Sequence, residues 1–179
     1  MSMAASSLPE FKVHYLKPGE IFLTTVPSLV TTVLGSCVSV TMHHRTSRMS
    51  VICHAAMPSS DQARHRKGKD DFLYVDSCLT WMIGQYSEKK IIKRDIEVKM
   101  FGGASMFTDR GLLGPDTNVG RKNIDAALDI LRRNGFTLAA WNVGGSQGRK
   151  LIFNTATGEI LTKFITRSEA SCIDFGGKK

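Results

Sequence analysis

A thiol and an imidazole stand close together in the sequence, with two hydroxyl side chains shortly before them. Cys37 and His54 are 17 residues apart, and Thr31 and Thr32 precede the thiol by six and five residues. A cysteine becomes a strong nucleophile when a neighbouring base takes its proton, and a third polar group commonly orients that base. These residue types therefore favour a hydrolytic cysteine site, provided that the fold brings them together.

The segments around the thiol and the imidazole have the pattern of a β-hairpin. Residues 37–43 and 48–55 both alternate as strands do, and a short polar link joins them. The apolar faces consist of Val38, Val40 and Met42 on the first strand and Met49, Val51 and Cys53 on the second. If these faces lie opposite each other, Cys37 pairs directly with His54, with Cβ atoms about 4.5–5.5 Å apart. A slip of two residues would keep the faces and make the pair diagonal.

The residues just before the thiol offer the other two parts of such a site. Gly35 and Ser36 interrupt the preceding strand, so backbone N–H groups there can point at an oxyanion. Thr31 and Thr32 each offer a hydroxyl or a carbonyl that can hold the imidazole in one orientation. The residues alone leave the choice between the two threonines open.

The rest of the chain predicts two helices among many short strands. Helices are expected from about Asp70 to Tyr86 and from Asn118 to Asn134, the second with Ile124, Ala127, Leu128 and Leu131 facing inward. Further strands are expected at residues 11–15, 21–25, 29–34, 95–101, 136–143, 149–153 and 159–165. This pattern favours an α+β fold, a single-domain layered α/β sandwich with mixed, hairpin-rich β-sheets and two main helices. The domain is expected to span residues 11–165, with flexible segments at 1–10 and 166–179.

Composition narrows the class of protein. With 179 residues, 42% of them hydrophobic and 22% charged, the chain is expected to form one soluble domain. We expect no membrane insertion and a cytoplasmic location, because we find neither an apolar run of roughly 18 residues nor a signal peptide. The four cysteines include no CxxC pair and are expected to be free thiols. The net charge of +8 favours acidic partners.

Three other kinds of site find little support in the residue spacing. A zinc site would have to combine Cys37, Cys53, His54 and Cys78. These residues lack the close ligand pairs of zinc sites, so no metal is expected. The glycine-rich segment 144–150 lacks the GxxxxGK[ST] spacing of a phosphate loop, and no cofactor is expected. The basic cluster 64–69 has no aromatic stacking pattern beside it, so nucleic acid is not an expected partner.

Several ordered motifs are shared with a known family. They are Leu34-Gly-Ser-Cys-Val-Ser-Val40, His54 with Met57-Pro58, Met100-Phe-Gly-Gly-Ala104 with Met106-Phe107, Gly120-Arg-Lys-Asn123, and Asn142-Val-Gly-Gly145 with Gly148-Arg-Lys-Leu-Ile-Phe153. Through these motifs the chain resembles the chemoreceptor glutamine deamidases, the CheD family, from about His14 to Ile165.

The resemblance implies hydrolysis of glutamine side chains to glutamate, with release of ammonia, on methyl-accepting chemotaxis receptors. In a papain-like arrangement it makes Cys37 the nucleophile and His54 the base. It makes Thr31 the orienting residue, with Thr32 as the alternative one position along. The implied reaction passes through a thioester and needs no cofactor, and some members also bind a CheC-type phosphatase. The alternative function is a non-catalytic module that binds receptors or a CheC-type protein.

Overall fold

A computed structural model gives the fold of most of the chain. The residues that it describes are 11–60, 71–105 and 118–165. Outside them lie the predicted flexible segments 1–10 and 166–179, the basic cluster 64–69 and Met106-Phe107. Within the described ranges, no helix is both long and apolar enough to cross a membrane.

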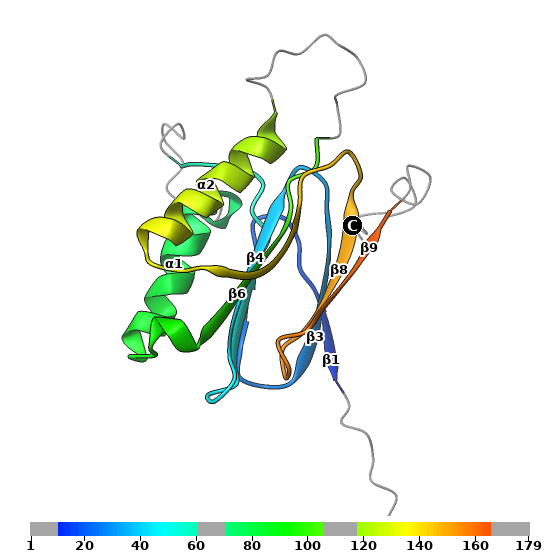
Figure 1. Cartoon of the computed structure of the whole chain (residues 1–179). Coiled ribbons are helices and arrows are strands. Elements are labelled where there is room, and N and C mark those ends of the chain that lie inside the picture. Colours follow the sequence, from blue (N-terminus) through cyan, green and yellow to red (C-terminus); the bar gives the residue numbers. More distant parts are fainter. Residues whose placement is uncertain (1–10, 61–70, 106–117, 166–179) are drawn as a thin grey trace, which may run out of the picture.

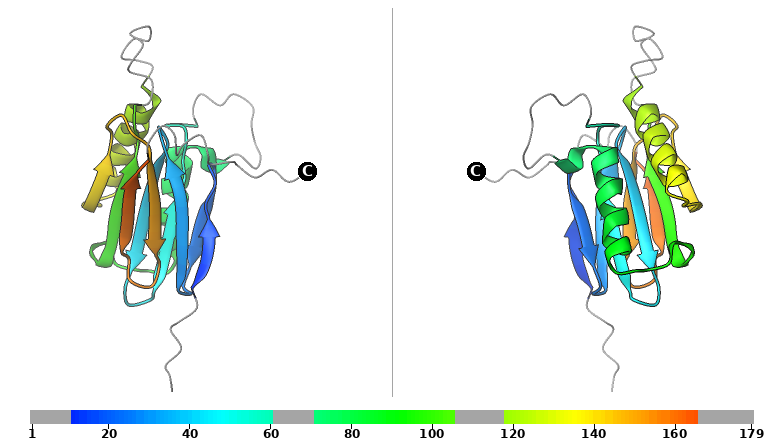
Figure 2. Two further views of the ribbon diagram at one scale, coloured as in Figure 1. Left: turned by 90° about the vertical axis from the view of Figure 1, so that its right-hand side faces the viewer. Right: turned by 90° about the vertical axis from the view of Figure 1, so that its left-hand side faces the viewer.

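Two helices and two sheets form three layers (Figures 1 and 2). The helices α1 (Val75–Glu88) and α2 (Val119–Arg133) cover one face of a five-stranded sheet, and a four-stranded sheet packs on its other face. The five-stranded sheet has the order β2 (Ile21–Thr24), β5 (Met49–Cys53), β4 (Val38–His44), β6 (Ile96–Gly102), β7 (Leu138–Val143). The four-stranded sheet has the order β1 (Lys12–Tyr15), β3 (Ser28–Leu34), β8 (Arg149–Asn154), β9 (Ile160–Phe164). Each sheet combines one parallel pair with antiparallel pairs, so the predicted α+β layered sandwich with mixed sheets is confirmed.

The predicted hairpin is present as β4 and β5, in the middle layer. Val38, Val40 and Met42 of β4 belong to the apolar core beneath the helices, together with three apolar residues of β5. The residues between them face the second sheet, and every residue from 38 to 43 is buried. The alternation in this strand therefore separates two buried faces, whereas in a surface strand it would separate core from solvent.

The register of the hairpin differs from the direct pairing of Cys37 with His54. Val38 lies opposite Ala55, which leaves Cys37 and His54 on a diagonal of the same face. The link between the strands takes four residues, 45–48, and the last of them has φ +55°. This link moves the pairing by two positions. Direct opposition was thus the wrong prediction, and the diagonal alternative is the observed one.

The helices agree with the prediction in position but not in every detail. A short 3₁₀ turn, Asp71–Leu73, precedes α1, so that helix begins at Val75 and not near Asp70. Asn118, where the second helix was predicted to begin, is the N-cap of α2, since its side-chain oxygen accepts a hydrogen bond from the first turn. Leu128, predicted to face inward, is 41% exposed. The other three residues predicted inward on this helix are buried: Ile124, Ala127 and Leu131.

Candidate active site

The predicted site residues lie at one end of the three layers. β3 ends at Leu34 and the chain turns through residues 35–37 into β4, while β5 ends at Cys53 and passes directly to His54. β6 ends beside this turn at Gly102, and α2 begins at the same end of the molecule (Figure 1). Strand ends from both sheets and one helix N-terminus therefore surround the thiol and the imidazole.

A threonine of the four-stranded sheet holds the histidine that follows β5. The Oγ1 atom of Thr32 lies 2.8 Å from His54 Nδ1 and 2.8 Å from the carbonyl oxygen of Leu16. A carbonyl can only accept a hydrogen bond, so the Thr32 hydroxyl donates to Leu16 and accepts from Nδ1–H of His54. The imidazole then carries its proton on Nδ1, which leaves the lone pair of Nε2 available to take a proton. All three residues are buried.

Thr31, the residue that the family resemblance assigns to this role, points the other way. Thr32 shares the buried face of β3 with its even-numbered neighbours, and Thr31 lies on the opposite face. The Thr31 hydroxyl has no hydrogen-bond partner within the described part of the chain. Of the two threonine hydroxyls in this described segment, that of Thr32 makes the hydrogen bond to His54 and that of Thr31 makes none.

Main-chain contacts fix the turn that carries the thiol. The N–H of Ala104 donates to the carbonyl of Gly35 at 2.8 Å, and the N–H of Gly103 donates to the carbonyl of Cys37 at 2.7 Å. Gly102 approaches so closely that a Cβ atom there would lie 2.2 Å from the Cys37 carbonyl oxygen. Its φ of +101° also favours glycine. The end of β6 thus holds the nucleophile segment by its backbone.

A buried asparagine, the last residue of the motif Gly120-Arg-Lys-Asn123, joins the two halves of the site. Asn123 lies in α2 and is fully buried. Its Nδ2 atom donates to the carbonyl oxygen of Ser36 at 2.9 Å and to that of Ala56 at 3.0 Å. One side-chain amide therefore bridges the residue before Cys37 and the residue two after His54. The hint in the sequence is a polar residue within the apolar stripe of the helix.

Burial acts on the thiol and the imidazole in opposite directions. It raises the pKa of the Cys37 thiol, although the main-chain N–H of the same residue has a lowering effect. Burial lowers the pKa of His54 to about 4, against the raising effects of the Leu16 carbonyl and the Glu20 carboxylate. At neutral pH the free site therefore holds a neutral thiol and a neutral imidazole, and not a thiolate–imidazolium pair.

The other two cysteines of the described chain belong to the apolar core. Cys53 and Cys78 are buried on the helix side of the five-stranded sheet, so the prediction that both are core residues is confirmed. Cys37 and His54 lie on the other face of that sheet, which separates the four residues weighed as a zinc site. In the described ranges, no group of three or more His, Cys, Asp and Glu side chains is arranged to hold a metal ion.

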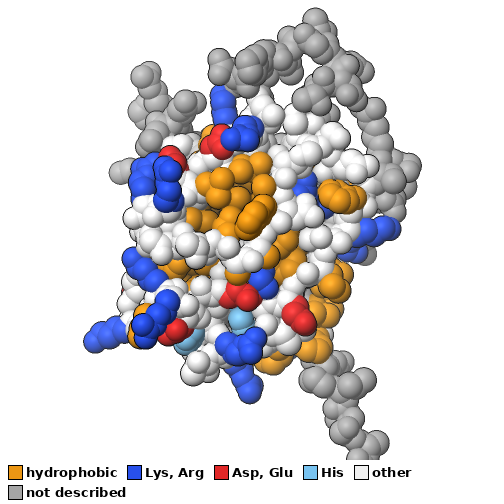
Figure 3. Space-filling model, viewed as in Figure 1, with side chains coloured by type: hydrophobic (Ala, Val, Ile, Leu, Met, Phe, Trp, Pro, Cys, Tyr) orange, Lys and Arg blue, Asp and Glu red, His pale blue; other side chains and the backbone are white. Residues whose placement is uncertain are grey.

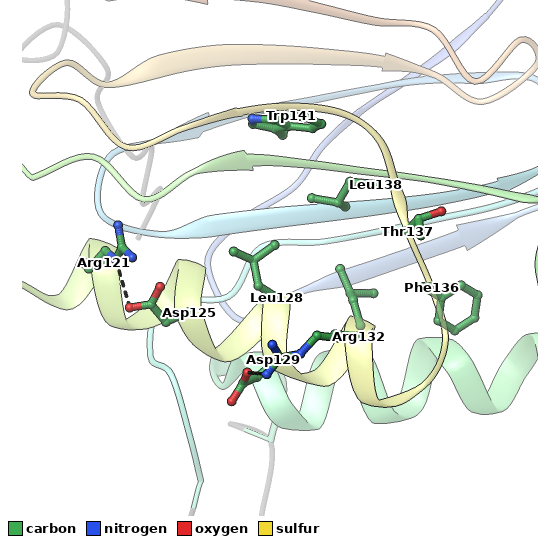
Figure 4. A pocket seen from close by; sticks show the side chains of 10 residues that line it. Arg121, Asp125, Leu128, Asp129, Arg132, Phe136, Thr137, Leu138 and Trp141 are labelled. Carbon is green, nitrogen blue, oxygen red and sulfur yellow. Dashed lines mark hydrogen bonds and ion pairs between the residues drawn. The ribbon is translucent and has the colours of Figure 1, made fainter.

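A groove of about 730 Å³ lies away from this site, between α2 and β7 (Figure 4). Its lining consists of Arg121, Asp125, Leu128, Asp129, Leu131, Arg132, Phe136, Thr137, Leu138 and Trp141. Trp141 is 65% exposed, and apolar side chains gather on this face of the molecule (Figure 3). None of the lining residues belongs to the thiol–imidazole site, so the groove is separate from it.

Comparison with known proteins gives relatives that share one family name. A protein of Geobacter sulfurreducens named "Probable chemoreceptor glutamine deamidase CheD 2" is 44% identical over 90% of this chain and 96% of its own length. Proteins named "Probable chemoreceptor glutamine deamidase CheD" occur in Nitratidesulfovibrio vulgaris and Thermococcus kodakarensis. The former is 35% identical over 87% of this chain and 78% of its own length, and the latter 32% identical over 76% and 82%.

A family model agrees with these relatives. The model described as "CheD chemotactic sensory transduction" matches residues 56–164. That match begins after both Cys37 and His54, but an alignment over 90% of a 179-residue chain includes the segment that contains them. On these matches, the chain belongs to the CheD family.

Proposed function

We propose that this protein hydrolyses side-chain amides of glutamine residues in chemotaxis receptors, leaving glutamate and releasing ammonia. The names of its relatives, chemoreceptor glutamine deamidases, supply the reaction and the substrate class. In this proposal Cys37 is the nucleophile, His54 is the base, and Thr32 takes the orienting role first assigned to Thr31. The observation that carries the assignment is the Thr32–His54 hydrogen bond, because it leaves Nε2 of a buried imidazole free to accept the thiol proton.

The reaction begins from the neutral pair. His54 Nε2 takes the proton of the Cys37 thiol as the sulfur attacks the carbon of the glutamine amide. The imidazolium then gives that proton to the amide nitrogen, the C–N bond breaks, and ammonia leaves a thioester on Cys37. A water molecule, deprotonated by His54, attacks the thioester carbon and releases glutamate and the free thiol. Thr32 keeps the same imidazole tautomer in both halves of the cycle.

The turn before the nucleophile is where we place the oxyanion of this reaction. The N–H groups of Ser36 and Cys37 donate to no other residue in the described part of the chain. Their carbonyl groups are engaged by Asn123 and Gly103, so the backbone of the turn is fixed before substrate arrives. Preorganised N–H donors of this kind stabilise the charge that develops on the amide oxygen.

Ammonia release from a purified receptor cytoplasmic fragment tests the proposal. The wild type is expected to release ammonia, with a matching glutamine-to-glutamate change in the mass spectrum of the receptor. Cys37→Ala is expected to release none, while Cys53→Ala, which removes a buried thiol from the other face of the sheet, keeps the activity. Equal release by wild type and Cys37→Ala would refute the assignment.

The same assay separates the enzyme from the non-catalytic alternative. A receptor- or CheC-binding module would bind the receptor fragment without releasing ammonia, and Cys37→Ala would bind equally well. We also propose a cytoplasmic location, supported by three free cysteines in the described chain, which is typical of reducing compartments. A CheC-type phosphatase as a partner is a further proposal from the resemblance, and a binding assay with the purified phosphatase tests it.

A further inference from the structure

We propose that Asn123 is a positioning residue that sets the separation between the nucleophile segment and the base segment. The inference rests on the proposed function, because that function requires Cys37 and His54 to stand at a fixed distance. The amide nitrogen of Asn123 donates its hydrogen bonds to backbone carbonyl groups and not to the side chain of Cys37 or His54. It acts on the backbone on both sides of the pair.

The two hydrogen bonds of Asn123 stand where the hairpin ladder ends. The last backbone pair of that ladder joins Val38 and Ala55, with two N–H to carbonyl distances of 2.9 Å. Beyond this pair, the carbonyl groups of Ser36 and Ala56 bond to the Asn123 amide, which continues the connection from outside the hairpin. The Asn123 side chain of α2 thus takes the place of the next hydrogen-bonded pair of the hairpin, beside Cys37.

The orientation of the Asn123 amide follows from its surroundings. An amide nitrogen carries two N–H donors, and each is directed at one of the two carbonyl groups. The reversed amide would place its oxygen against two carbonyl oxygens, so the hydrogen-bond network excludes it. Asn123 is fully buried, so water cannot replace either bond.

The backbone around Asn123 leaves the side chain little freedom. Gly120, one turn earlier in α2, lies so close to the loop after β6 that a Cβ atom there would be 2.6 Å from the carbonyl oxygens of Gly103 and Ala104. The same loop holds the carbonyl groups of Gly35 and Cys37. α2 therefore packs directly against the loop that binds the backbone of the nucleophile segment. This contact fixes the position of the Asn123 amide relative to that segment.

Packing alone does not account for an asparagine at this position. Its neighbours on the buried stripe of α2 are Gly120, Ile124, Ala127 and Leu131. The Oδ1 atom of Asn123 is buried and has no hydrogen-bond partner among the described residues. A buried polar atom without a partner lowers stability, so the benefit of this side chain lies in its two donated bonds.

Displacement of the hairpin end is expected to affect turnover more than binding. A misplacement of about 1 Å at reacting groups can lower a rate about 100-fold. We therefore expect Asn123→Ala to lower kcat about 100-fold and to change KM by less than about threefold. The opened hairpin would also admit water to His54, so its lowered pKa, about 4 in the folded protein, is expected to rise toward the ordinary value.

The experiment compares Asn123→Ala and Asn123→Asp with Asn134→Ala. Asn134 lies at the end of the same helix, and its Nδ2 donates to the Ile130 carbonyl at 2.8 Å, far along the chain from both site segments. For each variant, kcat and KM are measured with the receptor fragment, and the His54 pKa is measured by NMR of isotope-labelled histidine. A fall in kcat and a rise in the His54 pKa in both Asn123 variants, with neither change in Asn134→Ala, support the proposal.

Two outcomes would overturn it. One is an Asn123 variant whose kcat and His54 pKa match those of Asn134→Ala. The other is fast hydrogen exchange of the Asn123 side-chain amide in the wild type, a measurement that stands even if neither variant folds. If the wild type releases no ammonia, the proposed function fails, but the His54 pKa and the amide exchange still decide the role of Asn123.

Discussion

Replacing Thr32 by valine removes one hydroxyl and keeps the shape of the side chain. The hydroxyl makes two buried hydrogen bonds, one to the Leu16 carbonyl and one from His54 Nδ1. At about 1 kcal/mol for each bond, Thr32→Val is expected to lower the free energy of unfolding by about 2 kcal/mol. For a chain of this size that corresponds to a fall in Tm of about 4–8 °C.

The effect of Thr32→Val on turnover follows from the imidazole tautomer. Without the hydroxyl, Nδ1–H of His54 loses the acceptor that holds the proton on that nitrogen. In part of the protein molecules His54 then carries its proton on Nε2. That nitrogen has no free lone pair in this tautomer, so it cannot take the thiol proton. General base catalysis contributes about 10²- to 10⁴-fold to a rate, and a partial loss of the correct tautomer should lower kcat by about 10- to 100-fold.

Thr31→Val is the matched control on the same strand. It makes the same chemical change one residue earlier, at a hydroxyl without a hydrogen-bond partner among the described residues. We expect its Tm and its rate of ammonia release to stay close to those of the wild type. The reverse result, an inactive Thr31→Val beside an active Thr32→Val, would refute the tautomer argument and restore Thr31 as the orienting residue.

Three further predictions concern pH and salt. His43 and His54 have pKa values lowered by burial, that of His54 to about 4. Below pH 6.5 the unfolded chain therefore binds more protons than the folded chain does. Urea unfolding should show that the free energy of unfolding falls as the pH is lowered from about 6.5 to 4, by up to about 3 kcal/mol for His54. Stability that is constant over this range would contradict the neutral buried state. Alkylation of Cys37 by iodoacetamide, followed by mass spectrometry, should accelerate into the alkaline range, because its pKa is raised. A plateau of alkylation that begins in acid would indicate an ion pair instead. Receptor binding should weaken as salt is added, because the net charge of +8 favours an acidic partner, and salt-independent affinity would count against that interpretation.

The sequence predicts the hairpin well because the alternating pattern that defines it involves residues that are close together in the chain. Alternation of apolar residues placed Val38, Val40 and Met42 on one face and His54 on the other, as observed. The two-residue error in register came from the link 45–48, whose left-handed residue is an arginine and not a glycine. No turn signal in the sequence marks that conformation, so the sequence predicts a link of the right length, four residues, but places it one residue too early.

The remaining site residues depend on contacts between distant segments. Thr31 and Thr32 are alike in type and in spacing, and only the packing of β3 against the other sheet decides which one faces His54. Asn123 reaches the carbonyl of Ser36 across 87 positions of sequence, so local patterns mark it as a polar residue on an apolar stripe but do not show what it contacts. Leu128 shows the opposite failure, since helical spacing placed it inward, whereas it borders the groove between α2 and β7.

The side chains of Cys37, His54 and Thr32 come from segments of two different sheets. This sets the order in which the site is completed during synthesis. The hairpin that brings Cys37 and His54 together is local and can close as soon as β5 has emerged from the ribosome. The strand that carries Thr32 obtains its second neighbour only from β8, whose residues pair with it across more than 100 positions, as Leu34 does with Arg149. A growing chain therefore holds its thiol and its imidazole side by side before anything fixes the imidazole. The hydrogen bond between Thr32 and His54 is thus expected to form only after the C-terminal third of the chain, which contains β8, has been made.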